Sequence, residues 1–230
     1  MNKISIVIPV LNESDRIAQL IQYLRMNGGT ALNEILVIDG GSTDNTVALA
    51  QGAGATVLLC PVCSRAAQMN VGARHAQADL LYFVHADTLP PSTYVAEIEA
   101  SLQKGYVMGC FRYQFDSKSL ILRINAYFTR FHKLWCQGGD KTFYIKSEVF
   151  KALGGYDEYY VVMEEYDFLI RSMKQYPLDV MPANAIVSAR KYRQKSWLRV
   201  QIANLVAFSM FRRKVKPDRI KEVYLWILGV

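Results

Sequence analysis

The first half of the chain alternates short apolar runs with amphipathic segments, and this alternation constrains the fold more than any other feature. The apolar runs cover residues 3–10, 34–39, 55–60 and 79–84 and are rich in Ile, Val and Leu. Helices are predicted to begin near residues 14, 44 and 64, where apolar residues recur at helical spacing. Strands that are apolar throughout and separated by helices predict an α/β fold, with a mostly parallel, Rossmann-like sheet covered on both faces.

The second half of the chain has a less regular pattern. Strands are predicted at residues 107–115 and 142–146, and helices at residues 119–133, at 147–153 and from about residue 163. The helix over residues 119–133 carries an aromatic face. Beyond residue 196 the pattern is helical to the last residue, with one interruption at Pro217.

Polar side chains follow each of the first four predicted strands. They are, in chain order, Asn12 and Glu13, then Asp39, Arg65 and Asp87. Ligands of parallel α/β sheets bind in the crevice at the carboxyl ends of the strands. A ligand site is therefore predicted at this edge of the sheet.

The stretch "VIDGGSTDNT" ends the second strand with Asp39, and Gly40 and Gly41 follow it. Glycines allow a backbone to approach a ligand closely, so Asp39 is a candidate hydrogen-bond acceptor for a base or ribose. Because GxGxxG and GK[ST] are both absent, the stretch is neither a dinucleotide fingerprint nor a phosphate-binding loop. The alternative is that Asp39 and Asp44 only organise a turn.

The stretch "LLYFVHADT" places Asp87 just beyond the fourth strand. Hard divalent cations prefer carboxylate oxygens and often complete their shell with water and substrate phosphates, so one carboxylate can suffice. On an extended chain His85 points to the same side as Asp87. His85 then either ligates the metal or leaves it to Asp87 and a diphosphate, and we favour the second interpretation.

Glu164, Glu165 and Asp167 fall within one turn of a predicted helix in "MEEYDF". Crowded carboxylates repel, which tends to raise the pKa of one of them, and a carboxylate with a raised pKa suits a general base. The alternative is an acidic helix N-terminus that the helix dipole favours.

Charge is unevenly distributed along the 230 residues. The net charge is +7, yet residues 190–221 alone carry +10, so the remainder is about −3. Such asymmetry favours an anionic partner for the C-terminal part, with a solvated helix face as the alternative.

The motif "CPVC" (Cys60 and Cys63) is assigned to packing rather than to zinc or redox chemistry, because no second CxxC or CxxH accompanies it. The absence of a signal sequence and of a spanning apolar stretch predicts a cytoplasmic protein, at the inner face of the membrane if the basic part binds lipid.

Four stretches occur together in this order: "ISIVIPVLNE", "ILVIDGGSTDNT", "RAAQMNVGARHAQADLLYFVHADT" and "MEEYDFLIRSM". Together they resemble the family 2 glycosyltransferases of GT-A fold, in particular a small bacterial subgroup, over residues 3–176. The resemblance implies a nucleotide-sugar donor (UDP- or GDP-sugar), Mn²⁺ or Mg²⁺, and transfer with inversion to a hydroxyl acceptor.

The resemblance also implies roles for single residues. The donor nucleotide would contact Pro9, Asn12, Glu13, Asp39, Gly41, Arg65 and Asp87. Asp87 would be the last acid of the metal-binding DxD-type motif, with His85 in the place of its first acid. Glu165 would be the base, with Glu164 and Asp167 as the other candidates. Asp140 and Lys141 are assigned to the acceptor side.

This sequence departs from the family pattern in ways that bear on function. Gly40 stands where the second acid after strand two is usual, and the processive QxxRW motif is replaced by "YRQKSW", so single-sugar transfer is expected. A lipid-linked or anionic acceptor is favoured by the basic, aromatic tail. The rivals are a nucleotidyltransferase, and a non-catalytic binding module whose basic tail engages membrane or nucleic acid; for the main interpretation no nucleic acid is expected.

The predicted organisation is a glycosyltransferase domain over residues 1–190 and a basic helical extension over residues 191–230. Within the domain, residues 1–90 form the nucleotide-binding half and residues 91–190 the acceptor-side half.

Overall fold

A computed structural model describes residues 2–138 and 141–229 of the chain. It contains one eight-stranded sheet with strand order β3-β2-β1-β4-β7-β6-β8-β5. The strands are β1 (Ile4–Val10), β2 (Leu32–Asp39), β3 (Thr56–Leu59), β4 (Leu80–Phe83), β5 (Thr88–Leu89), β6 (Met108–Phe115), β7 (Phe143–Lys146) and β8 (Asp179–Val187). Four of the seven neighbouring pairs are parallel, so the mostly parallel sheet predicted from the sequence is confirmed.

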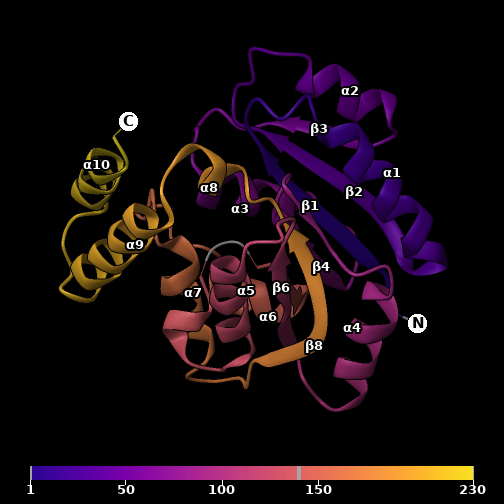
Figure 1. The fold of residues 1–230 in the computed structure, drawn as a ribbon. Coiled ribbons are helices and arrows are strands. Elements are labelled where there is room, and N and C mark those ends of the chain that lie inside the picture. The colour runs from indigo at the N-terminus through magenta and orange to yellow at the C-terminus, as the bar shows by residue number, and fades with distance from the viewer. Residues whose placement is uncertain (1, 139–140, 230) are drawn as a thin grey trace.

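Helices cover both faces of this sheet (Figure 1). They are α1 (Ile17–Gly28), α2 (Thr46–Gly52), α3 (Arg65–His75), α4 (Tyr94–Gln103), α5 (Leu120–Tyr127), α6 (Ser147–Ala152), α7 (Glu164–Ser172), α8 (Arg190–Gln194), α9 (Trp197–Arg212) and α10 (Pro217–Leu228). Short 3₁₀ helices lie at η1 (Gly29–Ala31), η2 (Phe128–Arg130) and η3 (Leu134–Cys136).

Alternation along β1 divides the core into two layers. Ile4, Ile6 and Ile8 pack with apolar residues of α1, α2 and α4 on one face of the sheet. Val7 points to the other face, where it joins a second cluster that includes residues of α3, α6 and α7. Because successive side chains of a strand point to opposite faces, a continuous apolar run supplies both layers.

Helix α3 approaches the sheet closely at Gly72. A Cβ atom on Gly72 would lie 2.3 Å from Val7 Cγ1 and 3.2 Å from Ile38 Cγ1. Only a residue without a side chain fits this contact between helix and sheet, which sets the distance of α3 from β1 and β2.

Several elements of the second half were not predicted or were predicted wrongly. Strand β8 was not predicted, because Pro182 and Asn184 interrupt the apolar pattern of a strand. The register with β6 shifts there, from Phe111 opposite Met181 to Arg112 opposite Asn184. Helix α4 and the two-residue strand β5 were also missed. The helix predicted over residues 119–133 ends at Tyr127 and continues only as the short turns η2 and η3.

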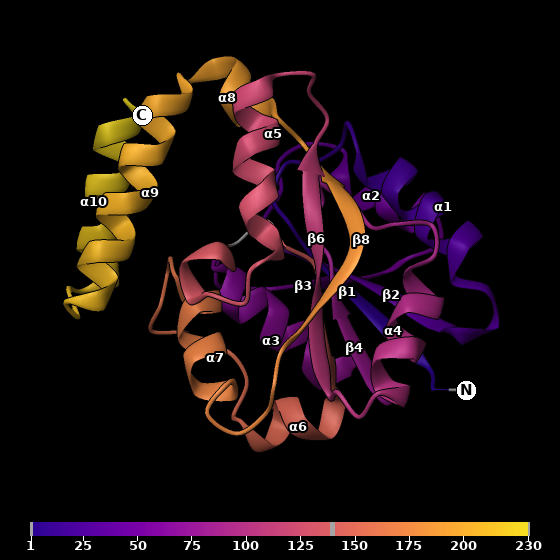
Figure 2. The same cartoon turned by 60° about the horizontal axis from the view of Figure 1, so that its bottom comes forward.

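The C-terminal helices α9 and α10 form a hairpin at the side of the domain, beyond α7 (Figures 1 and 2). Ala207, Phe211 and Ile220 pack there against Met163, Tyr166 and other residues around α7. Within the described residues, no helix combines the length and apolar character needed to cross a bilayer. The proposed division at residue 190 falls at the first residue of α8 and stays a prediction.

We predict that Gly72→Ala lowers the free energy of unfolding by about 1–3 kcal/mol, because the added methyl group would overlap Val7 and force α3 away from the sheet. Gly52→Ala is the matched control: it also lies in a helix, and no atom comes within 4 Å of its added Cβ. Chemical denaturation of both variants tests this. Equal stability of Gly72→Ala and the parent protein would contradict the close contact.

Candidate active site

The loops after β1 and β2 are joined by hydrogen bonds at the carboxyl ends of these strands. The backbone N–H of Asn12 donates to Ser42 Oγ (2.9 Å), and the N–H of Thr43 donates to Asn12 Oδ1 (2.8 Å). Asn12 has a positive φ of 55°, a conformation that Asn tolerates better than most residues. The two loops therefore form one unit.

Asp39, the last residue of β2, is buried and holds the turn that follows. Its carboxylate accepts hydrogen bonds from the N–H groups of Gly41 (3.0 Å) and Ser42 (3.0 Å and 3.2 Å). Gly41 has φ of 99°, which favours glycine. The carboxylate thus organises the turn, and its oxygens keep lone pairs with which a ligand donor could be bound.

Asp44 is an organiser of the same pair of loops. It accepts hydrogen bonds from the side chain and backbone N–H of Thr46 and from the N–H of Ser14 (3.2 Å). These bonds, the one from the Thr46 hydroxyl first, lower the pKa of Asp44 to about 2. Asp44 is therefore ionised at neutral pH and acts on the loop itself.

Gln68 of α3 was not singled out from the sequence, yet it links the two central strand ends. Its buried Nε2 donates to the carbonyl oxygens of Val10 (2.8 Å) and Ile38 (2.7 Å). A glutamine in a helical segment gives no sequence signal for this role. The bonds satisfy two backbone acceptors where the strands diverge.

Arg190, at the start of α8, is a second residue that sequence reasoning did not place at the site. Its Nη2 donates to Glu13 Oε1 (2.9 Å). The hydrogen bond that Arg190 donates to Glu13, and the negative charges of Glu13 and Asp87, together raise the pKa of Arg190 against the effect of burial. From the sequence, Arg190 was only one of many basic residues in the C-terminal part. The fold places it beside Glu13, a predicted donor-binding residue.

His85 and Asp87 do not share a face, which corrects the expectation from an extended chain. Strand β4 ends at Phe83, and the N–H of Thr88 donates to the His85 carbonyl oxygen (3.0 Å), so residues 85–88 form a turn. Asp87 lines a cavity of about 420 Å³ together with Asp15 and Asp116. His85 lines a different, smaller cavity of about 30 Å³.

His85 is directed to helix α7 and not to Asp87. Its Nε2 donates to Glu165 Oε1 at 3.1 Å, and both side chains are largely buried. Burial alone would raise the pKa of Glu165, but the hydrogen bond from His85 and the charges of His85 and Arg65 outweigh it, so the pKa of Glu165 is lowered. Glu165 is therefore ionised at neutral pH.

The other two acids of α7 have cations of their own. Glu164 is buried 3.5 Å from Arg65 Nη1, and burial raises its pKa although the charge of Arg65 opposes the change. Asp167 accepts a hydrogen bond from Arg171 Nε (2.7 Å). The crowding inferred from the sequence is thus relieved, and the raised pKa belongs to Glu164 and arises mainly from burial.

The small cavity beside His85 and Glu165 also contains Lys141. Its Nζ donates to the carbonyl oxygen of Thr129 (2.7 Å) and to Gln137 Oε1 (2.6 Å), and burial lowers its pKa. The acceptor-side residue Asp140 lies outside the described residues.

Cys60 and Cys63 carry free thiols, Cys60 buried and Cys63 exposed.

The described residues contain no group of three or more His, Cys, Asp or Glu side chains that could together hold a metal ion. The Nε2 of His85 is engaged by Glu165, which leaves Asp87 as the predicted protein ligand of the metal. One carboxylate fits a divalent cation whose remaining ligands are water and phosphate oxygens.

The similarity of this chain to known proteins identifies its family. The sequence model described as glycosyl transferase family 2 matches residues 5–153, which is more than half of the chain. The chain belongs to glycosyl transferase family 2. An uncharacterized glycosyltransferase of Mycobacterium tuberculosis is 26% identical to this glycosyltransferase over 178 residues, covering 74% of this chain and 68% of the relative. The undecaprenyl-phosphate 4-deoxy-4-formamido-L-arabinose transferase of Klebsiella pneumoniae is 31% identical over 122 residues, 49% of this chain and 37% of that protein.

Solved structures show the same fold. A mannosyltransferase from Pyrobaculum calidifontis, in complex with GDP-mannose and Mn²⁺, superposes with a TM-score of 0.69 at 16% identity, covering 99% of this chain and 72% of the other. Glucosyl-3-phosphoglycerate synthase from M. tuberculosis, in complex with Mn²⁺, UDP and glucosyl-3-phosphoglycerate, superposes with a TM-score of 0.61 at 16% identity, covering 100% and 81%. The predicted GT-A fold of this family 2 glycosyltransferase is confirmed.

We predict that Glu164→Gln changes how stability depends on pH. Because the pKa of Glu164 is raised in the folded state, its contribution is present below the ordinary value of 4.5 and is lost as pH rises through the folded pKa. Gln has no charge to bury, so the unfolding midpoint of the variant relative to the parent should rise with pH above about 4.5. A difference that stays constant between pH 4 and 8, in thermal unfolding with Glu148→Gln as the exposed control, would contradict this.

Proposed function

We propose that this glycosyltransferase moves a single sugar from a nucleotide-diphosphate sugar to a hydroxyl acceptor, with inversion at the anomeric carbon and with a divalent cation. The proposal is carried by one observation: an ionised Glu165, oriented by His85, lines a cavity next to the turn that follows β4. A family 2 glycosyltransferase needs a base for the acceptor hydroxyl, and of the three acids on α7 Glu165 is the one that lines this cavity.

The chemistry proposed for Glu165 uses its second carboxylate oxygen. Oε1 accepts the hydrogen bond from His85, and we assign the acceptor proton to Oε2. The deprotonated hydroxyl oxygen then forms a bond to the anomeric carbon while the bond from that carbon to the diphosphate oxygen breaks on the opposite face. A single displacement of this kind inverts the configuration. Glu164 is held by Arg65, and Asp167 by Arg171, so neither has the same freedom to accept this proton.

Donor binding is assigned to the joined loops after β1 and β2. Asn12, Asp39 and Gly41 lie at these strand ends, and Pro9 pairs with Ile38 within the sheet next to them. Arg65 and Arg190 are the cations that we assign to the anionic diphosphate; each also pairs with a glutamate, Glu164 and Glu13 respectively. The two solved structures of the same fold contain UDP and GDP-mannose, so UDP- and GDP-sugars are the donors to test.

The cation is assigned to Asp87 as its one protein ligand. When bound, it supplies positive charge that stabilises the departing diphosphate. Since His85 is engaged by Glu165, the diphosphate itself has to complete the site. For the acceptor we favour a lipid-linked compound, since the Klebsiella relative is by its name an undecaprenyl-phosphate transferase. The hydroxyl group as the accepting atom is our proposal for this chain.

We predict that Mn²⁺ and nucleotide stabilise the protein together and not separately. In thermal-shift measurements with a panel of UDP- and GDP-sugars, the unfolding midpoint should rise only when donor and Mn²⁺ are both present. Asp87→Asn should lose the Mn²⁺-dependent part of that rise. Asp15→Asn, which changes the same charge in the same cavity, should keep it. Stabilisation by no member of the panel would contradict the proposed function, and a strong effect of Mn²⁺ alone would contradict the donor-completed site.

We predict that Glu165→Gln lowers kcat by about 10²–10⁴-fold with the donor found in that panel, because Gln cannot accept the proton. The donor-induced thermal shift should persist, since Glu165 is not assigned to donor binding. Glu164→Gln is the matched comparison on the same helical turn and should retain most of the activity. If Glu164→Gln lost activity and Glu165→Gln did not, the base would be Glu164.

A further inference from the structure

An exposed apolar surface covers helix α5 and the turns after it. In the described part of the chain, nineteen large hydrophobic side chains are exposed, and seven of them lie within residues 120–135. We call these seven the aromatic patch: Leu120, Ile121, Ile124, Tyr127, Phe128, Phe131 and Trp135. Such clustering of apolar side chains, in contrast to scattered single ones, marks an interaction surface.

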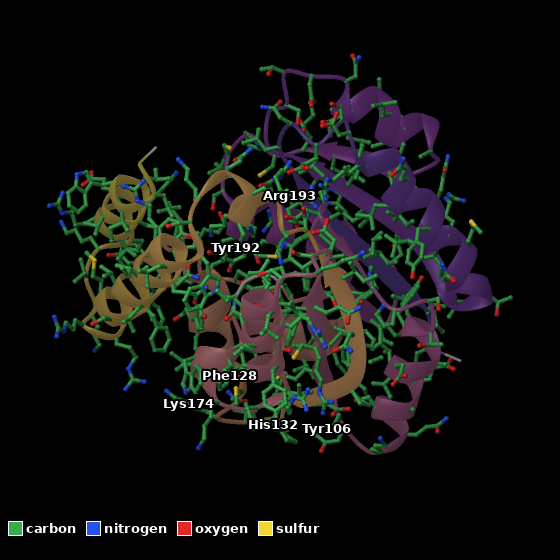
Figure 3. All side chains as sticks on the ribbon, viewed as in Figure 1. Tyr106, Phe128, His132, Lys174, Tyr192 and Arg193 are labelled. Atoms are coloured by element: carbon green, nitrogen blue, oxygen red, sulfur yellow. The ribbon has the colours of Figure 1, made fainter. Side chains whose placement is uncertain are left out.

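The rings of the aromatic patch contact one another, so the patch is continuous. Phe128 lies 6.1 Å from Tyr127, 6.1 Å from Phe131 and 6.0 Å from Trp135, measured between ring centroids. Phe128 and the neighbouring His132 lie at the lower edge of the molecule in Figure 3. Figure 2, in which this edge is turned forward, shows α5 at the front of the domain.

Helix α5 is apolar on both of its sides. Leu122 and Ala126 are buried and pack with Phe115 and Val187, which anchors the helix to the sheet. Its opposite side carries Ile121 and Ile124, 50% and 53% exposed. Apolar side chains exposed on one side of a helix whose opposite side is buried mark an interaction surface. We therefore expect an apolar partner to cover the outer side of α5.

The charges within the segment that carries the patch are all of one sign. Residues 118–137 contain no Asp or Glu, and the four charged residues Lys118, Arg123, Arg130 and Lys133 are all exposed. Arg130 lies over the Tyr127 ring, with Cζ 3.7 Å from the ring centroid. Aromatic and aliphatic side chains bordered by Lys and Arg are the composition of surfaces that lie in the interface of a membrane.

We propose that the aromatic patch is a docking surface for a bilayer of anionic phospholipid. The exposed aromatic and aliphatic side chains would enter the boundary between headgroups and acyl chains, while the four basic side chains contact lipid phosphates. A second copy of the chain is a poorer occupant, because a symmetric contact would bring two sets of four positive charges together. This surface is distinct from the basic C-terminal part that the sequence suggested as the membrane contact.

The C-terminal part borders this surface. Leu198, Ile202 and Leu205 form an exposed stripe on α9. The Tyr192 hydroxyl joins the two elements, since it accepts hydrogen bonds from Asn125 Nδ2 of α5 (3.5 Å) and Gln201 Nε2 of α9 (3.4 Å). The stripe on α9 is therefore the rival surface that an experiment has to separate from the aromatic patch.

Vesicle sedimentation tests the proposal with the whole 230-residue chain. We expect binding to vesicles of phosphatidylcholine and phosphatidylglycerol, and little binding to phosphatidylcholine alone. The double substitution Phe131→Ser and Trp135→Ser should weaken binding about tenfold or more, because two apolar side chains leave the interface. The matched control is Met26→Ser with Leu59→Ser, which removes two side chains that are 84% and 72% exposed elsewhere on the surface. Its binding should equal that of the parent protein.

Three results would overturn the proposal. The first is no binding to anionic vesicles by the folded parent protein. The second is binding that persists in the patch variant and is lost in Leu198→Ser with Leu205→Ser. The third is a dimer of the parent protein, detected by analytical ultracentrifugation, that the patch variant abolishes. Brominated lipids give a readout that does not depend on affinity: tryptophan emission should be quenched in the parent protein and less so in Trp135→Phe.

Discussion

Helix α7 places three carboxylates on one turn, and the site depends on each of them having a separate partner side chain. Arg65 comes from α3, His85 from the turn after β4, and Arg171 from α7 itself. Arg65 and His85 connect α7 to two other parts of the fold, and Arg171 connects it to a third by donating to the carbonyl oxygens of Leu153 and Gly155. The backbone enters this helix through Met163 with φ of 68°, a left-handed conformation that these surrounding contacts stabilise. Charge pairing therefore fixes both the helix and its acids.

The sequence predicted the first half of the fold well because local pattern and global structure agree there. Strands β1 to β4 are apolar runs, and burial on both faces of a parallel sheet requires that pattern. The carboxyl ends of these strands carry Asp39 and the Asn12 loop, and the hydrogen bonds between the two loops show that these ends lie together. The sequence therefore predicts the position of a residue when that position follows from the order of the strands alone.

Other features depend on contacts between distant segments, which a single sequence does not contain. Gln68 has the same appearance as any polar residue on a helix, yet it bonds two strand ends. Glu165 was not predicted as the partner of His85, because residues 85–88 form a turn. The rule that side chains two residues apart point to the same side holds only in an extended strand. Crowded acids on α7 suggested one raised pKa, but which acid carries it depends on burial and on cations from other elements.

The pair of Arg190 and Glu13 joins residues that are 177 positions apart in the chain. During synthesis β1 to β4 can assemble early, since their partners are close in sequence, whereas the edge of the sheet at Glu13 lacks its cation until the chain has passed residue 190. Contacts of such long sequence separation carry a high entropic cost of closure and form late in folding. In a nascent chain, β1 to β4 can thus assemble long before the loop after β1 has its ion-pair partner, which comes from a segment made 177 residues later.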